Sequence, residues 1–441
     1  MKKIFYFVCA IAMTFGFTAC KDEPDKFELT DGLPTINYIR PADIASSDSL
    51  LTQAYMQAQL CIVGSNLTSI REMYFNDVKA TLVTSYITDN TLLVSVPNSI
   101  PKEVSNKIYM ITNGGDTVKY DFHVIVPPPT ISSMSCEYAR PGSIVTLVGD
   151  YFIDDPNTPL TVTFKGASGD VTVPTDDINV TKTAISFYMP EGASEGPVEV
   201  STIYGKGTST FYYLDTRGMM FDFDGATGLT NRGWHDRTIT TDDTAITGNY
   251  VQLGDGKATM SESGGWDDSQ FSFEYWPGDW TDPVSYPAAG VRLFDLVDFS
   301  DWENMAIKFE MYIPSSNPWK AGAMQVIMAG TDRVSFGNAG VDIYGNTVAG
   351  CNNSYLQDDV LPRAFYRPWT NNGSYDTANE WVTVTLPIKS SFTYGFSGAS
   401  ATGSLSETDF ASLVIFVVEG GVKGTECNPI IRIDNIRAVP N

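Results

Sequence analysis

Short apolar runs alternate with turn residues along nearly the whole chain. The runs are rich in Val, Ile, Thr, Tyr and Phe, and Gly, Pro, Asn and Asp separate them; examples are Thr91–Val96, Ile144–Val148, Val198–Ile203 and Trp381–Leu386. Short runs of this composition between turn residues are typical of β-strands. Long helical periodicity is absent, and only Asp48–Gln59 is compatible with a short helix. The pattern therefore predicts an all-β protein.

One order of strands occurs twice in the first half of the chain. Each copy begins with Pro-x-Ile, continues with an apolar strand that ends in glycine, and reaches a strand that ends in proline. These positions are Pro34, Gly64 and Pro97 in the first copy and Pro129, Gly149 and Pro190 in the second. The matching glycines lie 85 residues apart and the matching prolines 93. A unit of that length is a small β-sandwich, in which glycine can take the positive φ that a strand-ending turn needs.

Both copies resemble the IPT/TIG type of immunoglobulin-like domain. The second copy matches better, because Phe152 follows its glycine where the first copy has Leu67. The resemblance implies two Ig-like sandwiches, at residues 34–127 and 128–215. Pro127–Pro129 is predicted to join them as a stiff, extended connector. Neither copy shows an identifiable site, so we expect both domains to be spacers.

The remaining residues, 216–441, have the length of one larger jelly-roll-like sandwich. This module opens with Phe-Asp-Phe-Asp-Gly at Phe221–Gly225 and closes with a strand that contains Ile-Asp-Asn. Both features resemble carbohydrate-binding jelly rolls, in which the first and last strands often pair. That pairing would bring Asp222, Asp224 and Asp434 together as oxygen ligands of a structural calcium ion. Ordinary turn and strand-end aspartates are the alternative, and no other cofactor is expected.

The N-terminus has the layout of a bacterial lipoprotein signal. Two lysines precede an apolar run, Ile4–Phe17, and Thr-Ala precedes Cys20. Residues 1–19 are predicted to be the signal peptide, and the small residue before Cys20 resembles the lipobox, in which the cysteine is lipidated. An ordinary secretory signal is the alternative. Residues 20–33 are charged at their start and are predicted to be a flexible tether.

The segment after Cys20 resembles the surface-export signal of outer-membrane lipoproteins. This resemblance implies that the protein lies on the extracellular face of the outer membrane. Later segments lack the length and apolarity of a transmembrane helix, so the lipid would be the only anchor.

The chain of 441 residues has a formal net charge of −24. Binding to a nucleic-acid backbone needs local positive charge, so this balance argues against nucleic acid and favours a neutral ligand.

The cysteines beyond the predicted lipidation site are widely scattered, at Cys61, Cys136, Cys351 and Cys427. They form no Cys-x-x-Cys pair, which disfavours a zinc ribbon or a redox motif. A disulfide between Cys351 and Cys427 and four separate buried thiols both remain open.

All eight tryptophans lie between Trp234 and Trp381, so ligand recognition is predicted for the C-terminal module. Trp302 and Trp381 lead into strands and are expected to pack in the core. Trp319 and Trp369 instead stand in loops that contain proline and glycine, where a rigid indole can stack on the flat face of a sugar ring. Trp280 follows a turn and is predicted to be a third contact. Polar and aromatic residues of the same loops complete the predicted site, namely Lys320, Tyr366, Arg367 and Asn371.

The whole mature chain resembles the cell-surface glycan-binding lipoproteins of the B type. The most specific local features are Asn-Pro-Trp-x-x-Gly at Asn317–Gly322, Tyr-x-Pro-Trp at Tyr366–Trp369, the strand from Trp381, and the closing Ile-Asp-Asn-Ile-Arg. The resemblance implies platform roles for Trp319, Tyr366 and Trp369. It also implies a non-catalytic, monomeric protein that captures neutral plant β-glucan, such as xyloglucan or mixed-linkage glucan. Its partners would be an outer-membrane oligosaccharide importer and a companion glycan-binding lipoprotein.

Two other functions remain open. A glycoside hydrolase needs only a pair of Asp or Glu side chains, but no pattern places such a pair. A His-Glu-x-x-His zinc site is excluded because His123 and His235 are the only histidines. An adhesin that binds host protein is compatible with tandem sandwiches, although rigid tryptophan loops favour sugar.

Overall fold

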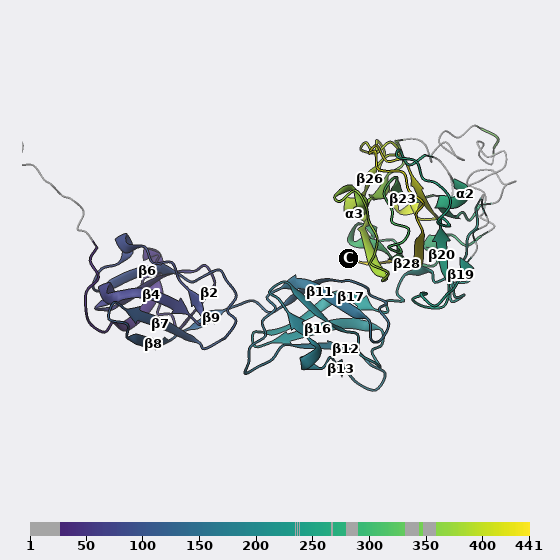
Figure 1. Cartoon of the computed structure of the whole chain (residues 1–441). Helices are drawn as coiled ribbons and strands as arrows, with labels where there is room; N and C mark the ends of the chain where they lie inside the picture. Colours follow the sequence, from purple (N-terminus) through teal and green to yellow (C-terminus); the bar gives the residue numbers. More distant parts are fainter. Residues whose placement is uncertain are drawn as a thin grey trace, which may run out of the picture. The chain divides into compact units, whose positions relative to one another are not determined.

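The computed structural model describes residues 27–233, 235, 237, 239–265, 268–278, 290–330, 344–346 and 359–441 (Figure 1). The described chain is nearly all β, which confirms the predicted fold class. Its α-helices are two single turns, α2 (Asp268–Phe271) and α3 (Ile388–Ser391). The helix considered at Asp48–Gln59 is wrong: this segment contains strand β2 (Gln53–Tyr55), which pairs in parallel with β9 (His123–Ile125).

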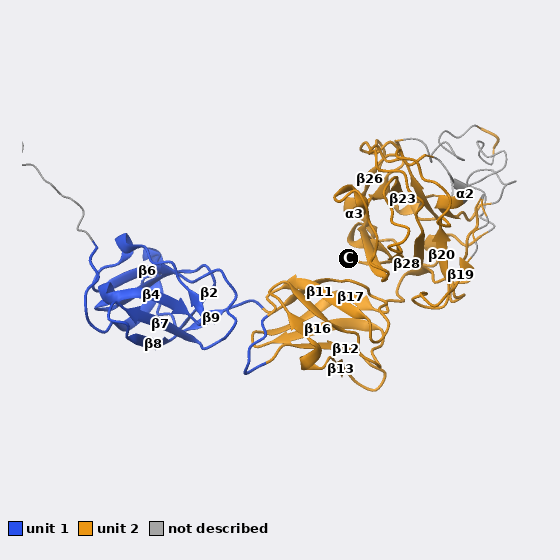
Figure 2. Cartoon of the chain, viewed as in Figure 1, with its two compact units in different colours: residues 1–127, 153–158 blue, residues 128–152, 159–441 orange. Residues whose placement is uncertain are grey.

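The chain forms two compact units, coloured separately in Figure 2. Residues 1–127 and 153–158 form the first unit, and residues 128–152 and 159–441 form the second. Unit 1 therefore contains the first Ig-like repeat. Unit 2 contains most of the second repeat together with the C-terminal module.

The first Ig-like domain is a sandwich of two antiparallel sheets. One sheet has the order β1-β3-β6 and the other the order β5-β4-β7-β8. The strands are β1 (Thr35–Pro41), β3 (Gln59–Ser65), β4 (Ile70–Phe75), β5 (Val78–Lys79), β6 (Thr91–Ser95), β7 (Lys107–Thr112) and β8 (Thr117–Asp121). Leu60, Met73, Leu92 and Ile108 are buried between the two sheets.

The second Ig-like domain repeats this architecture with the orders β10-β11-β15-β14 and β13-β12-β16-β17. The strands are β10 (Thr130–Met134), β11 (Ile144–Asp150), β12 (Thr161–Phe164), β13 (Val171–Thr172), β14 (Asn179–Val180), β15 (Ala184–Tyr188), β16 (Gly196–Thr202) and β17 (Gly205–Tyr213).

The two domains share the close approach that fixes the repeated glycine. Ile36 pairs with Gly64 just before a register shift, and Ile131 pairs with Gly149 just before an equivalent shift. A Cβ added at Gly64 would lie 1.8 Å from the carbonyl oxygen of Thr35, and one added at Gly149 would lie 1.9 Å from that of Thr130. No side chain fits at either position, so the repeated glycine is required by backbone packing. The positive φ expected from the sequence is found at neither glycine, and that part of the prediction is wrong.

The C-terminal module is a sandwich of two larger sheets. The first has the order β19-β20-β28-β22-β25, with β18 also paired to β28; the second has the order β21-β27-β23-β24-β26. The strands of the first sheet are β18 (Met219–Phe221), β19 (Ile239–Thr240), β20 (Tyr250–Leu253), β22 (Met305–Tyr312), β25 (Val382–Pro387) and β28 (Ile431–Pro440). Those of the second are β21 (Ser272–Tyr275), β23 (Ala323–Ala329), β24 (Arg363–Tyr366), β26 (Phe392–Tyr394) and β27 (Ser412–Val418).

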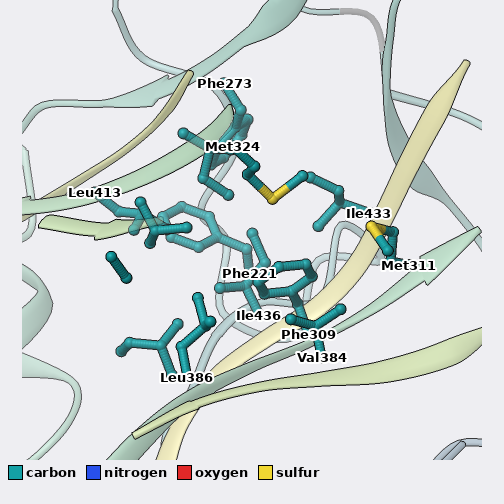
Figure 3. Close-up of a cluster of buried hydrophobic side chains, with 14 of the residues drawn as sticks. Phe221, Phe273, Phe309, Met311, Met324, Val384, Leu386, Leu413, Ile433 and Ile436 are labelled. Carbon is teal, nitrogen blue, oxygen red and sulfur yellow. The ribbon is translucent and has the colours of Figure 1, made fainter. Parts of the chain in front are cut away.

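The main core of this module lies between its two sheets. Phe221, Phe309 and Ile433 of the first sheet meet Phe273 and Met324 of the second (Figure 3). The pairing of β18 with β28 joins the first and last strands of the module, as the sequence predicted.

The second Ig-like domain and the C-terminal sandwich share one apolar cluster. Trp381, Tyr312 and Tyr250 of the sandwich pack in the same cluster as Val145 and Phe187 of the Ig-like domain. The Trp381 indole donates a hydrogen bond to the carbonyl oxygen of Thr244 (2.6 Å). Trp381 is therefore a packing residue, as predicted from its strand.

A buried ionic cluster lies beside this apolar cluster and consists of Glu137, Lys308, Glu310 and Arg437. Glu137 belongs to the Ig-like domain, and the other three belong to the sandwich. The Arg437 guanidinium contacts Glu137 at 2.7 Å and Glu310 at 2.8 Å, and Lys308 contacts Glu137 at 2.5 Å. Every charge in the cluster has an opposite partner, which is the condition under which buried charges are tolerated.

Among the described residues, no helix is both long and apolar enough to cross a membrane.

Candidate functional site

Three strands of the second sheet of the C-terminal sandwich, β21, β23 and β27, are buried on both faces, whereas β24 and β26 are partly accessible. The outer face of this sheet, away from the main core, carries polar and aromatic residues. The strand register places Ser272, Phe416, Gln325 and Phe365 in one row across β21, β27, β23 and β24. The next row contains Glu274, Val414, Ile327 and Arg363. We call these eight residues the outer-face rows. A polar group within a sheet that is otherwise core needs a reason beyond packing.

Gln325 and Arg363 form the centre of this face, and both are fully buried. The Arg363 guanidinium donates to the Gln325 side-chain oxygen (3.1 Å), and the Gln325 amide donates to the carbonyl oxygen of Phe396 (3.3 Å). The guanidinium also lies 5.9 Å from the centre of the Phe396 ring. These contacts hold both polar side chains in one geometry, as a pre-organised site requires.

A second polar group lies at the β21 end of the same face. Ser272 donates to the Glu274 carboxylate (3.0 Å), and an imidazole nitrogen of His235 lies 3.1 Å from the same carboxylate oxygen. Arg237 donates to the Ser272 hydroxyl (3.2 Å). Glu274 is fully buried, and its contacts compensate for the loss of water around the carboxylate.

The half-buried aromatic pair of Phe365 and Tyr394 lies at the β24 and β26 end of the outer face. The two rings stack with centroids 5.0 Å apart and an interplanar angle of 18°. The Arg367 guanidinium lies 5.5 Å from the centre of the Phe365 ring and donates to the carbonyl oxygen of Gly420. Flat, partly accessible rings beside a fixed cation provide both parts of a sugar contact, a stacking face and hydrogen-bond donors.

The prediction that Trp319 and Trp369 form an exposed platform is wrong. Trp319 is 0% exposed and Trp369 is 3% exposed, and both belong to the main core. The Trp319 indole donates to the carbonyl oxygen of Ala321 (2.5 Å), and the Trp369 indole donates to that of Gly322 (2.7 Å). The loops fold back so that each indole fills the end of the sandwich with its N–H satisfied, because burying so large an apolar surface is strongly favourable.

Tyr366 packs with these tryptophans on the core side of β24. Its ring lies 6.2 Å from that of Trp319, and burial, with a contribution from Tyr375, raises the pKa of its hydroxyl. Tyr366 is half-buried, whereas its neighbour Phe365 points to the outer face. The aromatic residue of this loop that suits ligand contact is therefore Phe365, which sequence reasoning missed although the alternation along the strand places the two on opposite faces.

Three of the predicted polar contacts keep accessible side chains. Arg367 and Lys320 are half-buried, and Asn371 is exposed. Of these, the structure places Arg367 beside the Phe365 ring. Ligand contact by Lys320 and Asn371 stays a prediction.

Several predicted residues lie outside the described part of the chain. Trp280, Cys20 and Cys351 are among them. Cys427, the suggested partner of Cys351, is a buried free thiol. Trp302 is half-buried and packs at the edge of the core against Phe410, as predicted.

The three aspartates predicted to hold calcium do not form a metal site. Asp222 accepts from the backbone N–H of Ala226 (2.9 Å), Asp224 from that of Asn249 (2.6 Å), and Asp434 from that of Asn435 (2.7 Å). No group of three His, Cys, Asp or Glu side chains within the described ranges is arranged to bind a metal ion.

Asp434 is the most deeply buried of the three aspartates. Burial raises the pKa of this carboxyl to about 8. With no cation beside it, a carboxyl with that pKa is largely neutral at pH 7. Pairing of the first and last strands was predicted correctly.

Residues 213–440 match the family model of the surface glycan-binding protein B xyloglucan-binding domain, and residues 129–216 match that of the IPT/TIG domain. The chain is similar to the crystal structure of the surface glycan-binding protein PbSGBP-B from Prevotella bryantii, with 48% identity and a TM-score of 0.82. That alignment covers 93% of this chain and all of the other.

Two further matches are more distant. An IPT/TIG domain-containing protein from Bacteroides ovatus is 29% identical over 142 residues, which are 31% of this chain and 28% of the relative. The chain thus matches little more than a quarter of that relative's length. The surface glycan-binding protein from a complex xyloglucan utilization locus in Bacteroides uniformis is 13% identical, with 93% of this chain and all of that chain covered and a TM-score of 0.37.

The close match to PbSGBP-B over nearly the whole chain and the domain match over residues 213–440 agree with each other. This chain therefore belongs to the surface glycan-binding protein B family.

Proposed function

We propose that the protein is a non-catalytic surface receptor that captures neutral β-glucan, xyloglucan or mixed-linkage glucan, through its C-terminal sandwich. The observation that carries this proposal is the match of residues 213–440 to a xyloglucan-binding domain. The net charge of −24 supports an uncharged ligand, because an anionic polysaccharide would be repelled.

The outer face supplies the binding chemistry in this proposal. The stacked rings of Phe365 and Tyr394 receive the C–H face of a sugar ring, and Arg367 donates to its hydroxyl groups. The buried pair of Gln325 and Arg363 holds β23 and β24 in register behind these contacts. A rigid support lowers the entropy that the site loses on binding.

The proposed location is the extracellular face of the outer membrane. Lipidated Cys20 anchors the chain, and residues after it form the tether, so the membrane contact is the lipid alone. The monomeric receptor passes captured glucan to an outer-membrane importer and works beside a companion glycan-binding lipoprotein. Replacement of Cys20 by alanine is expected to release the protein from membranes, and its retention would refute this anchor.

Affinity electrophoresis of the full chain against a panel of polysaccharides tests the proposed ligand. We expect retardation by neutral β-glucans without release of reducing ends. Steady release of reducing ends would show that the protein is a glycoside hydrolase. Retardation by none of the glucans, together with binding to a host protein, would favour an adhesin.

Substitution of Phe365 tests the proposed site. Phe365→Ala should weaken glucan binding about tenfold, since a stacked aromatic contributes about 1 kcal/mol beyond its buried area. Phe294→Ala is the matched control, because Phe294 is a half-buried ring of the same sandwich whose cation partner, Arg292, lies 4.8 Å from the ring centre. Equal binding by the two variants would show that the outer face is not the site.

A further inference from the structure

The first Ig-like domain carries a groove of about 850 Å³ on one side of its sandwich. Strands β3 and β6 form part of its wall, where Gln59 pairs with Ser95. The short 3-10 helix Thr84–Tyr86 forms another part and places Tyr86 at the groove. Concave sites that bind small molecules have about 300–1,000 Å³ of space, so the groove is large enough to hold a segment of an oligosaccharide.

Aromatic and aliphatic side chains at the groove remain open to solvent. Tyr86 is 56% exposed, Val83 is 44% exposed and Leu93 is 37% exposed, and all three line the groove. The interior of the domain is filled instead by residues such as Leu92 and Val94, which flank Leu93 on β6 and point to the opposite face. An exposed tyrosine ring beside aliphatic groups is a surface on which the C–H face of a sugar can stack.

The polar lining of the groove consists mainly of amides and hydroxyls. The Gln57 amide donates to the side-chain oxygen of Asn98 (2.8 Å), and the Gln57 N–H donates to the carbonyl oxygen of Val96 (3.0 Å). A side-chain amide has two donors and two acceptor positions, so each partner keeps capacity for a ligand after this bond. Gln57 has a φ of 68°, a conformation that costs free energy in a residue other than glycine and is concentrated at functional sites.

The groove is almost free of charge. Among the described residues that line it, Lys79 is the one charged side chain, and its ammonium group pairs with Glu72 at 3.2 Å. A groove for an anionic polymer or for an acidic peptide would need uncompensated cations. Amides that bond sugar hydroxyls, beside an aromatic face, fit a neutral glycan instead.

We propose that this groove is a second binding site for neutral β-glucan, with Tyr86 as its stacking face and Gln57, Gln59 and Asn98 as its hydrogen-bonding groups. The ligand class rests on the proposed function of the C-terminal sandwich. Two sites on one chain can engage one polymer, so the second binding event becomes intramolecular and raises the avidity for long glucan. The first Ig-like domain is then a weak binding module and not a spacer.

Hydrogen–deuterium exchange of the full chain tests the second site directly, with a xyloglucan oligosaccharide as the probe. We expect bound oligosaccharide to slow exchange at residues 57–59 and 84–86 as well as at residues 363–367. Tyr86→Ala should remove the protection at the first two segments and leave the third unchanged. Tyr38→Ala is the control, because Tyr38 is an exposed tyrosine of the same domain that does not line the groove.

Calorimetry provides an independent measure of the same site. Titration of the wild-type chain should require two oligosaccharides per chain, whereas Tyr86→Ala should require one or weaken the second site about tenfold. Protection confined to residues 363–367, with one oligosaccharide per chain, would overturn the second site and leave the proposed function intact. Absence of binding to any glucan would overturn both. If the groove variants lost only association with an importer, the groove would be a protein-docking surface and the proposal would be wrong.

Discussion

The two Ig-like domains share a strand order but differ in what surrounds them. The first belongs to unit 1, whereas the second shares its apolar cluster with the C-terminal sandwich. Corresponding residues of β1 and β10, such as Thr35 and Thr130, lie 95 positions apart, and the same offset places Ala42 opposite Glu137. One copy therefore has a methyl group where the other has the carboxylate that pairs with Lys308 and Arg437. A repeated fold therefore does not imply a repeated role, because the two copies carry different side chains at the same position.

The largest expected effect comes from the feature that both domains share. Gly64→Ala and Gly149→Ala each force a Cβ against a backbone carbonyl oxygen, so each should cost more than about 4 kcal/mol of unfolding free energy or prevent folding. Differential scanning calorimetry should show that Gly64→Ala affects only unit 1, whereas Gly149→Ala also destabilises the C-terminal sandwich. The control is Gly114→Ala, where the nearest atoms to an added Cβ lie 3.8 Å away.

Ion pairs should show the difference between the two Ig-like domains most clearly, because the pair at the second domain is buried and the pair in the first is exposed. Arg437→Met leaves the Glu310 carboxylate buried without its cation and should cost about 3–5 kcal/mol. Lys107→Met in the first domain removes a solvent-exposed ion pair with Asp121 and should cost about 0–1 kcal/mol. Urea denaturation measures both values. Similar costs for the two variants would contradict the distinction between the buried and the exposed ion pair.

Trp381 tests the apolar part of the same junction. Trp381→Ala should cost about 3 kcal/mol, because it removes a buried indole from a cluster shared by the two domains. The loss should broaden or split the thermal transition of unit 2 and leave that of unit 1 in place. A single unchanged transition would mean that the second Ig-like domain gains nothing from its neighbour.

The smallest effect concerns pH and is confined to unit 2. Asp434 has a folded-state pKa raised to about 8 by burial, so its protonated form stabilises the fold below the unfolded-state pKa, and this contribution is lost as the pH rises toward 8. We expect the stability of unit 2 to fall by about 1 kcal/mol between pH 6 and pH 7, and Asp434→Asn to remove this slope. Thermal unfolding at several pH values measures this slope.

Added calcium tests the same carboxyl in another way. We expect the melting temperature to stay unchanged; an increase that requires Asp434 would restore the calcium prediction.

The sequence predicted the architecture well and the site poorly, for identifiable reasons. Gly64 and Gly149 recur at the same position of a repeated sequence pattern, so their repetition reported the Ig-like fold correctly, although each is required by the carbonyl of a neighbouring strand. The loops of Trp319 and Trp369 also contain proline and glycine, but local composition does not say toward which side a loop folds. Both indoles found apolar partners and carbonyl acceptors in the core, contacts that depend on residues distant in sequence.

The outer face was hidden for a related reason. Gln325 lies on β23, which is buried on both faces, and Arg363 lies at the buried start of β24, so neither position shows the apolar and polar alternation of a half-exposed sheet. Their hydrogen bond joins positions 38 residues apart, and only the pairing of β23 with β24 reveals it. The role of Glu137 could not be predicted from the sequence either, because its partners Lys308 and Arg437 follow it by 171 and 300 residues.

The buried ionic cluster determines where the chain can be truncated to give a shorter glycan-binding fragment. The family match begins at residue 213, and a fragment cut there would retain Lys308, Glu310 and Arg437 but not Glu137. Such a fragment would expose Trp381 and would leave Lys308 and Arg437 with one carboxylate in place of two. Aggregation or binding to acidic surfaces could then be mistaken for ligand capture. A fragment that starts at Pro128 keeps Glu137 and the second Ig-like domain, so both the apolar cluster and the ionic cluster stay intact. It is shorter than the full chain, and its glycan binding can still be interpreted.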